Sequence, residues 1–512
     1  MIRTDIATND DPMFSMWRIS WIAHALRHSP AHLLDGNVFH PSTSTLTQSD
    51  ATLLEGVLAT PLLWASVSPT TAYNLLLLGG IAASGVAMFL LARGVIGGTG
   101  PALVSAAIFT MTPYRIEHFM HLELQWAMWI PLTFWSLHRA VDEGSVRRGA
   151  LAGLFLFLQI VSCVYYGVFL AIASSLLVLL LGLADPRRFV AALPGLAVGG
   201  LVAVALTAPY AWPYVKTARM LGPRDLAEVA SYSATPLSYL TSPPQNWLWG
   251  WTSSRWGGRE LSLYPGIVAV ALALAAIAHR PRRLVWVYWV VAAGAVDLSF
   301  GVHGWLYPVL LHLPGLQGLR VPARWSVVAC CAIALLAGLG VRALQERVSG
   351  SPARAAMVAA AIVAIAVDFA NTGMYLMTAD KPDDATVYRI MRSMGPGVVI
   401  ELPLPVPEGL PGRDAQYEYW SIAHWYPLVN GYSGYYPPEY IETLDKMRSF
   451  PNDQSIDRLK TLDVRYIVVH RAFYQPDRYT SLALQIGQRR ELRSYGAYRD
   501  PVGVADLFAL ER

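Results

Sequence analysis

The chain has 512 residues, of which 54% are hydrophobic and only 14% are charged. Soluble domains carry about 25% charged residues, so this composition excludes an ordinary soluble protein and indicates that lipid surrounds most of the chain. The formal net charge of +4 is small and gives no argument for nucleic-acid binding. Residues 380–512 hold 16 Lys and Arg and 18 Asp and Glu, which predicts a separate water-soluble domain.

An aromatic-rich helix is expected at the N-terminal end, just after Asp11. Pro12 suits the first position of a helix, with Asp11 as its N-cap. Phe14, Trp17 and Trp21 would then form an apolar stripe on a helix that lies on the membrane surface. Two interpretations of Asp11 stay open. It only caps the helix, or its carboxylate takes a proton from a hydroxyl nucleophile at the outer boundary of the membrane.

Residues 52–66 form a second apolar stretch that contains Glu55 and Pro61. The stretch is too short to span a membrane, so we expect an interfacial helix there. Nothing before residue 52 is apolar enough for a signal peptide or an anchor. A chain of this kind would ordinarily begin with another span, and we therefore expect its first transmembrane helix to be missing.

Ten apolar segments follow, and we predict a membrane span for each of them. They cover residues 70–93, 97–112, 122–139, 147–163, 165–184, 189–210, 263–279, 283–300, 323–344 and 354–377. Arginines follow every second segment, and by the positive-inside rule the connections that hold them are cytoplasmic. These arginines are Arg93, Arg139, Arg147, Arg148, Arg187, Arg188, Arg280, Arg282, Arg283, Arg342, Arg347 and Arg354.

This topology predicts three domains. Residues 1–69 form an extracytoplasmic loop with interfacial helices. Residues 70–378 form the transmembrane domain and include an external loop at 211–262. Residues 379–512 form an extracytoplasmic α/β domain, in which 397–403 and 464–469 are strand-like segments bounded by turn residues.

The connection from Thr112 to Gln125 is dense in ionisable residues at an outer membrane boundary. Such residues are unfavourable there and are functional candidates by default. The candidates for substrate contact are Arg115, Glu117, His118, His121 and Gln125. Two alternatives remain, an interfacial turn whose side chains reach for water and a metal site from the two histidines and a glutamate.

The external loop 211–262 is rich in tryptophan and ends near Glu260. Tryptophans at this density fit an interfacial belt, and they equally fit stacking on a sugar or packing along a polyprenyl chain. Arg320 and Arg324 are also placed outside, where we expect exposed guanidinium groups at the level of the lipid headgroups. They suit either a bound phosphate or plain contact with lipid. Asp297 and Asp368 would either face a cavity or cap loops.

The three cysteines, Cys163, Cys330 and Cys331, all lie in apolar segments. They predict small buried side chains and neither a disulfide nor a thiolate metal site. No cofactor is predicted, although a divalent metal stays open.

Taken together, these features resemble the GT-C membrane glycosyltransferases. More narrowly they resemble bacterial polytopic proteins with an external C-terminal domain that are related to protein mannosyltransferases and YfhO-type sugar transferases. The family's Gly-Asp-Pro motif, followed by Trp and a Trp-x-x-His segment, is matched by Asp11-Pro12, Trp17 and Trp21-Ile22-Ala23-His24, with Asp10 in the glycine position. Its Ser/Thr-Pro-Tyr-Arg-x-x-His-x-x-His element is matched by Thr112-Pro113-Tyr114-Arg115, His118 and His121. Other similar segments are Glu260 before Leu263-Tyr264-Pro265-Gly266, Arg320-Val321-Pro322-Ala323-Arg324, Val429-Asn430-Gly431-Tyr432-Ser433-Gly434-Tyr435 and Val464-Arg465-Tyr466-Ile467-Val468-Val469-His470.

The resemblance implies an α-helical polytopic membrane protein of about ten spans in a bacterial cytoplasmic membrane, with the C-terminal domain outside. It implies inverting transfer of a sugar from a polyprenyl-phosphate donor to an extracytoplasmic glycan, lipid or protein. Asp11 would be the general base, and Arg320 and Arg324 would stabilise the leaving phosphate. The remaining residues expected to contact substrate are Asp10, His24, Arg115, Glu117, His118, His121, Gln125 and Glu260.

A non-enzymatic membrane protein is the alternative, either a carrier or an assembly protein for lipid-linked glycans. Transporters place ionisable residues near the middle of the bilayer, whereas those in this chain gather at its outer edge. The sequence therefore favours the transferase.

Overall fold

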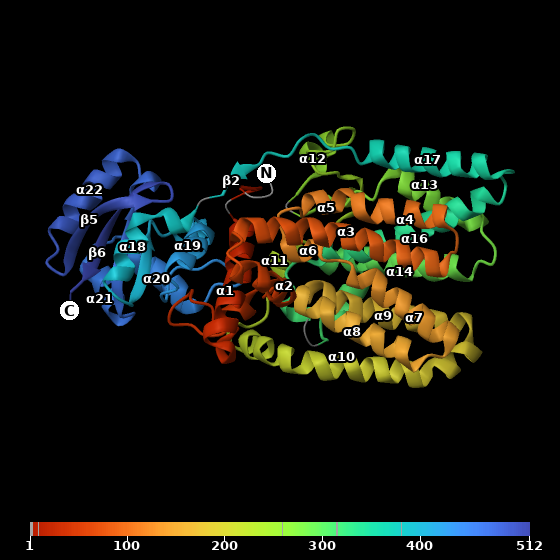
Figure 1. Ribbon diagram of the computed structural model, residues 1–512, viewed down its shortest axis with the longest axis horizontal. Coiled ribbons are helices and arrows are strands. Elements are labelled where there is room, and N and C mark those ends of the chain that lie inside the picture. Colours follow the sequence, from red (N-terminus) through yellow and green to blue (C-terminus); the bar gives the residue numbers. More distant parts are fainter. Residues whose placement is uncertain (1–3, 9, 259, 314–315, 380, 512) are drawn as a thin grey trace. The chain divides into compact units, whose positions relative to one another are not determined.

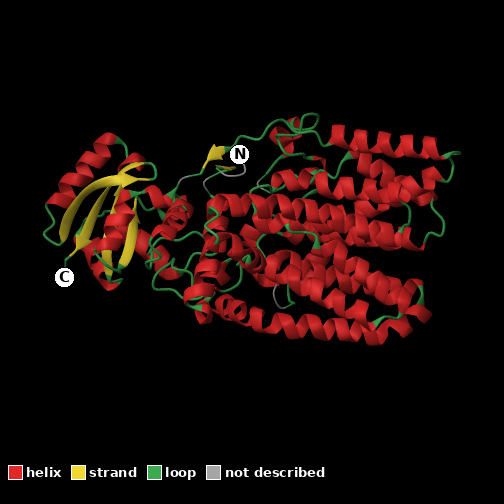
Figure 2. Cartoon of the chain, viewed as in Figure 1, coloured by secondary structure: helices red, strands yellow, loops and turns green. Residues whose placement is uncertain are grey.

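A computed structural model describes residues 4–8, 10–258, 260–313, 316–379 and 381–511 of the chain. It divides into two compact units. The first unit joins residues Met1–Leu75 to Tyr375–Arg512, and the second comprises Leu76–Met374. Both are drawn in Figure 1, and Figure 2 shows that the described strands belong to the first unit whereas the second is helical.

The second unit is built from long helices that are joined by short ones. Its helices are α3 (Pro69–Val95, which begins in the first unit), α4 (Thr99–Met111), α5 (Pro113–Glu117), α6 (Leu122–Gln125), α7 (Trp129–Glu143), α8 (Val146–Ser162), α9 (Val164–Ala184), α10 (Pro186–Leu221), α11 (Leu226–Ser231), α12 (Trp251–Trp256), α13 (Ile267–Ala275), α14 (Arg283–Ser299), α15 (Leu306–Leu310), α16 (Ser326–Gln345) and α17 (Ser351–Asp368). A helix therefore lies in each of the ten segments that were predicted to span the membrane.

Several of the predicted segments differ in extent. The helix over 189–210 is longer than predicted, since α10 continues to Leu221 within the predicted external loop 211–262. The segment 122–139 is interrupted between α6 and α7, where the Trp126 indole donates to Leu76 O at 3.0 Å and Gln125 folds back toward His118 O at 2.8 Å. The last segment ends at Asp368, whose carbonyl accepts from the Asn246 side chain and whose carboxylate accepts from the Trp249 indole. Among the described residues, five helices are long and apolar enough to cross a membrane. They are Pro69–Val95, Val164–Ala184, Pro186–Leu221, Pro322–Gln345 and Ser351–Asp368, and the chain is a multi-pass membrane protein.

α16 is the central helix of the second unit, because nearly all of its residues are buried. It approaches α13 closely at Gly340, where an added Cβ would lie 1.8 Å from Leu272 O. α8 and α10 meet in the same way, since a Cβ on Gly149 would lie 1.9 Å from Gly195 O. Small residues let membrane helices pack backbone against backbone. Cys163, Cys330 and Cys331 are buried, as predicted.

The first unit holds a four-stranded sheet in the order β3-β4-β6-β5. β3 (Val398–Leu402) and β4 (Val464–His470) are parallel, and β6 (Gly503–Leu510) pairs antiparallel with both β4 and β5 (Leu492–Asp500). Both predicted strands are thus confirmed. The helices of the C-terminal part are α18 (Thr386–Ser393), α19 (Asp414–Trp420), α20 (Pro438–Met447), α21 (Asp453–Thr461) and α22 (Pro476–Gly487).

The N-terminal residues complete the first unit. α1 (Asp11–His28) and α2 (Leu53–Trp64) pack together, and α1 also packs against α19. Short strands β1 (Asp5–Ile6) and β2 (Met377–Thr378) pair antiparallel. Residues Pro12 to Ala23 of α1 are all buried, so the helix does not present the wide polar face that an interfacial helix has.

Candidate functional site

Asp11 lies at the start of α1 in the first unit. The helix begins at Asp11 itself, and Asp10 occupies the N-cap position without a capping hydrogen bond from its side chain. The prediction that Asp11 is the N-cap is therefore wrong by one residue, because Pro12 takes the second helical position and not the first. The Asp11 carboxylate is half-buried, and its Oδ1 accepts a hydrogen bond of 2.8 Å from the Tyr432 hydroxyl.

His24 shares α1 with Asp11 but lies farther along the helix. With a rise of 1.5 Å per residue, the two are separated by about 20 Å. The His24 ring stacks on Trp425 with centroids 4.5 Å apart and lies 4.6 Å from the His28 ring. Burial, with the neighbouring His28, lowers the pKa of His24 to about 4, so its imidazole is neutral at physiological pH. The first unit thus places His24 away from Asp11.

Glu260 and Arg324 form a buried ion pair in the second unit. Arg324 Nε donates to Glu260 Oε2 at 2.7 Å, and Nη2 donates to Oε1 at 2.9 Å, which is the bidentate geometry of a strong pair. The exposed fractions of the two side chains are only 7% and 12%. The expectation of an exposed Arg324 guanidinium is therefore wrong, because this guanidinium is buried against the Glu260 carboxylate.

His118 lies beside this pair, with Nδ1 4.0 Å from Glu260 Oε2. Its ring is buried, and neither of its nitrogens makes a hydrogen bond within the described chain. Burial lowers the pKa of His118 to about 3. Burial alone would raise the pKa of Glu260, but the Arg324 guanidinium holds it well below its usual range. Glu260 and Arg324 thus form an ionised pair, and the imidazole next to them is neutral.

Arg115 and Gln125 brace the turn between α4 and α7. Arg115 donates to Phe109 O at 3.0 Å and to the side-chain oxygen of Gln125 at 3.1 Å, and Gln125 Nε2 donates to His118 O at 2.8 Å. Both side chains are buried. Arg115 Nη2 nevertheless lacks a hydrogen-bond partner among the described residues, so one donor of this cation remains available to a ligand.

Glu117 and His121 lie at the edge of the same turn. Burial raises the pKa of Glu117 to about 7, with the Glu260 charge adding to the shift and a hydrogen bond from Ser262 opposing it. The His121 ring centroid is 5.7 Å from that of His118. Helix α5 ends at Glu117, so His118 and His121 lie beyond its end. Among the described residues, no group of three or more His, Cys, Asp or Glu side chains could hold a metal ion.

Arg320 forms a second cationic position in the second unit. Its Nη1 lies 3.5 Å from Glu228 Oε1, its backbone N–H donates to the Tyr165 hydroxyl at 2.9 Å, and its guanidinium lies over the Tyr232 ring. The side chain is 26% exposed, so water and ligands can reach it. Its Nε has no hydrogen-bond partner within the described part of the chain. Arg320 therefore keeps the accessibility that Arg324 lacks.

Asp297 and Asp368 cap loops. Asp297 accepts from the backbone N–H groups of Trp305 and Leu306. Asp368 accepts from the Trp249 indole, the Tyr264 hydroxyl and the backbone of Val268. The structure thus decides between the two alternatives that the sequence left open.

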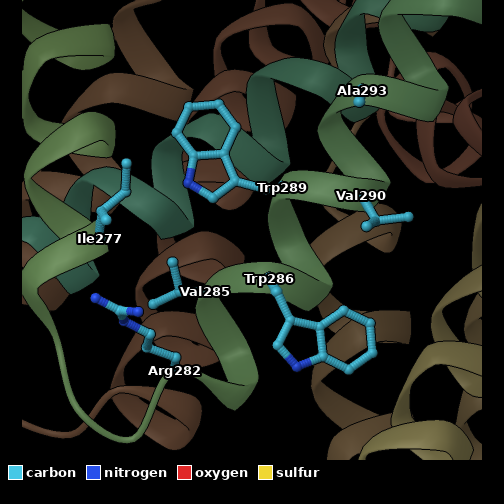
Figure 3. A pocket seen from close by; sticks show the side chains of 7 residues that line it. All are labelled: Ile277, Arg282, Val285, Trp286, Trp289, Val290 and Ala293. Carbon is cyan, nitrogen blue, oxygen red and sulfur yellow. The ribbon is translucent and has the colours of Figure 1, made fainter.

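An apolar groove of about 450 Å³ lies elsewhere in the second unit. Ile277, Arg282, Val285, Trp286, Trp289, Val290 and Ala293 line it. Figure 3 shows the two indole rings on α14 and the single charged side chain, Arg282. None of the predicted site residues lines this groove, and a nearly unbroken apolar lining gives no group for transfer chemistry.

Sequence reasoning missed Tyr432, Glu228 and Tyr165 as partners of candidate residues. Tyr432 lies in the motif Val429–Tyr435, which was noted without a role. The sequence does show Glu228 four residues after Arg224, and the two side chains form an ion pair at 3.6 Å. Tyr165 gave no signal, because it belongs to an apolar segment.

No protein-family model and no curated protein matches this sequence. Among solved structures, the chain is similar to the arabinofuranosyltransferase AftD from Mycobacteria, with a TM-score of 0.63 and 14% identity over 99% of this chain and 40% of that one. It is also similar to ArnT from Cupriavidus metallidurans in the apo state, with a TM-score of 0.51 and 12% identity over 99% of this chain and 94% of that one. The chain thus spans about two fifths of the length of AftD. At these identities the likeness establishes the fold, and the chain has the fold of the GT-C membrane glycosyltransferases that its motifs resemble.

Proposed function

We propose that the protein is an inverting glycosyltransferase that moves a sugar from a polyprenyl-phosphate donor to an extracytoplasmic acceptor. The acceptor hydroxyl attacks the anomeric carbon and gives its proton to Asp11, while the bond from that carbon to the phosphate oxygen breaks and polyprenyl phosphate leaves.

The observation that carries the proposal is the set of buried donors without partners in one region of the second unit. Arg115 Nη2, the one ring N–H of the neutral His118 and Arg320 Nε belong to it. Buried donors are almost always satisfied, and a cluster of exceptions calls for a partner such as a water, an ion or a ligand. His118 and Arg320 both lie within electrostatic range of the pair formed by Glu260 and Arg324. A phosphate accepts several charge-assisted hydrogen bonds and fits this set.

The test is the release of polyprenyl phosphate from a panel of radiolabelled polyprenyl-phosphate sugars, measured with purified protein and an extracytoplasmic glycan or lipid fraction. Transfer of label to the acceptor together with release of the carrier supports the transferase. A non-enzymatic carrier for lipid-linked glycans would bind the donor without releasing the carrier lipid. Binding without turnover across the panel would therefore refute the proposal.

The proposal includes ten membrane spans with both the 211–262 loop and the C-terminal domain outside the cytoplasm. The arginine distribution supports this topology. Reporter domains fused after Leu240 and after Gln345 are expected in opposite compartments, the first outside and the second inside. A phosphatase and a fluorescent reporter, each active on one side only, measure this. Reporters in the same compartment would refute the ten-span topology.

Replacing Arg320 by Ala is expected to raise the KM for the donor by about 10-fold or more, since a hydrogen bond to a charged group contributes about 1.5–3 kcal/mol. Folding should change little, because partly exposed ion pairs such as Arg320 with Glu228 contribute at most about 1 kcal/mol. Arg320→Lys should recover only part of the affinity, since an ammonium cannot form the two parallel bonds of a guanidinium.

Arg255 is the matched control for this experiment. It is an exposed arginine on α12, in the external loop of the same unit. Arg255→Ala should leave the KM for the donor unchanged. Equal increases in the two variants would mean that overall positive charge, and not a phosphate contact at Arg320, sets donor affinity.

A further inference from the structure

A segment of the C-terminal domain, residues 430–432, reaches the proposed base within the first unit. The Tyr432 hydroxyl donates to Asp11 Oδ1 at 2.8 Å. The Tyr432 ring packs edge-on against Phe14, which is one turn into α1, with centroids 5.1 Å apart and an interplanar angle of 75°. The two partners are 421 residues apart in the chain, so tertiary folding alone creates this contact.

Hydrogen bonds at Asn430 and at the Tyr432 backbone fix the segment. The Tyr432 backbone N–H donates to Glu418 Oε1 at 3.0 Å, and Glu418 is fully buried on α19. The Asn430 side chain donates to Glu401 O at 3.0 Å and to Asp414 Oδ1 at 3.2 Å, and its oxygen accepts from the Glu401 backbone at 2.8 Å. α19 and β3 thus hold the segment before and at the tyrosine.

Close packing limits how the segment can move. A Cβ on Gly431 would lie 2.6 Å from the Phe39 ring, so no side chain fits at this position without a shift of that ring. The Phe39 backbone N–H donates to Asn430 O at 3.1 Å. The N-terminal and C-terminal parts of the first unit therefore clamp residues 430–432 between them. The phenol is held in place before any substrate arrives.

In this contact the Tyr432 hydroxyl is the donor and the Asp11 carboxylate is the acceptor. Burial and the Asp11 charge raise the pKa of Tyr432 above its ordinary range, so the phenol stays protonated and donates. A hydrogen bond that is donated to a carboxylate stabilises the charged form. A carboxylate offers about four acceptor positions, so one bond from Tyr432 leaves capacity for the proton of an incoming hydroxyl.

We propose that Tyr432 is a positioning residue for Asp11. It orients the carboxylate by donating a hydrogen bond to it, so the C-terminal domain takes part in the chemical step through this side chain. This role rests on the proposed function, because it assumes that Asp11 acts as the base.

The test is the pH dependence of kcat for transfer from the polyprenyl-phosphate sugar, measured on the full chain. In Tyr432→Phe, kcat should fall about 10-fold at neutral pH, with the KM for the donor unchanged, because the phenyl ring keeps its contact with Phe14 and only the hydroxyl is lost. The acidic limb of the profile should move up by about one pH unit, since a pKa unit corresponds to about 1.36 kcal/mol of differential stabilisation.

The matched control is Tyr479→Phe. Tyr479 also donates its hydroxyl to a carboxylate, that of Asp506, in the same unit. Its replacement removes the same kind of bond elsewhere and should move neither kcat nor the acidic limb. Incorporation of 3,5-difluorotyrosine at position 432 gives a change of opposite sign. Its more acidic phenol donates a stronger hydrogen bond, and the acidic limb should move to lower pH.

An acidic limb that does not move in Tyr432→Phe overturns the proposal, whatever the loss of rate, because a merely structural tyrosine would lower the amount of active protein without shifting the profile. If Tyr432→Phe does not accumulate, the protein with 3,5-difluorotyrosine at position 432 tests the proposal instead. An acidic limb that does not move in that protein overturns the proposal. A wild-type chain that releases no carrier lipid from any donor refutes the proposed function and this role together. An active wild type with unmoved profiles refutes the role alone.

Discussion

Replacing Asp11 by Asn is expected to lower turnover by about 10²- to 10⁴-fold with donor binding retained, because a base that removes a proton in the transition state contributes that much. The fold should be preserved. Asp10, and not Asp11, occupies the N-cap position of α1. An amide oxygen at position 11 can still accept the Tyr432 hydroxyl hydrogen bond, so the variant removes the charge and the basicity and little else.

Transfer from a radiolabelled polyprenyl-phosphate sugar measures turnover, and retention of the donor on the purified variant measures binding. Asp10→Asn is the control, because Asp10 is exposed at the neighbouring position. Its replacement should have only a mild effect on turnover. If Asp11→Asn remains active, the base assignment is wrong. Glu117 would then be the next candidate, since burial raises its pKa to about 7, near the value at which a general base works best at neutral pH.

Replacing Arg324 by Ala is expected to lower the free energy of unfolding by about 3–5 kcal/mol, because it leaves the Glu260 carboxylate buried without its partner. Glu260 has a positive φ of 61°, a conformation that surrounding contacts must maintain in a non-glycine residue. Because the pair depresses the pKa of Glu260, its contribution is complete at neutral pH and is lost only as the pH falls below the unfolded value of about 4.3. Denaturant unfolding of the detergent-solubilised protein measures the change.

The control is Arg342→Ala, which breaks an exposed i,i+4 pair with Glu346 whose side chains are 43% and 49% exposed. That change should cost about 0.3–0.5 kcal/mol at most. The double variant Arg324→Leu with Glu260→Leu should recover much of the stability, since it leaves no buried charge without a partner. An Arg324→Ala protein of wild-type stability but weaker donor use would show that Arg324 binds the donor phosphate and that the pair is secondary.

The predicted helices were accurate where hydrophobicity alone decided them. The long apolar segments and the arginines between them follow from the free-energy cost of placing charges in lipid. This cost is a property of each single residue, so the sequence alone reveals it. The interruption at Trp126 was not predictable, because it depends on a hydrogen bond to Leu76 O on another helix. The N-cap error at Asp11 has a similar cause, since the geometry of the preceding backbone places Pro12 in the second helical position.

By itself, the sequence determined the helical segments, the strands at 398–402 and 464–470 and the chemical types of the candidate residues, because these depend on local periodicity and composition. Only the tertiary structure decided which candidates are paired. Arg324 faces Glu260, 64 residues away, and this pairing turns an expected phosphate ligand into half of a buried ion pair. Asp11 faces Tyr432, 421 residues away. Such partners are chosen by packing between distant segments, and no local pattern of residues records that choice.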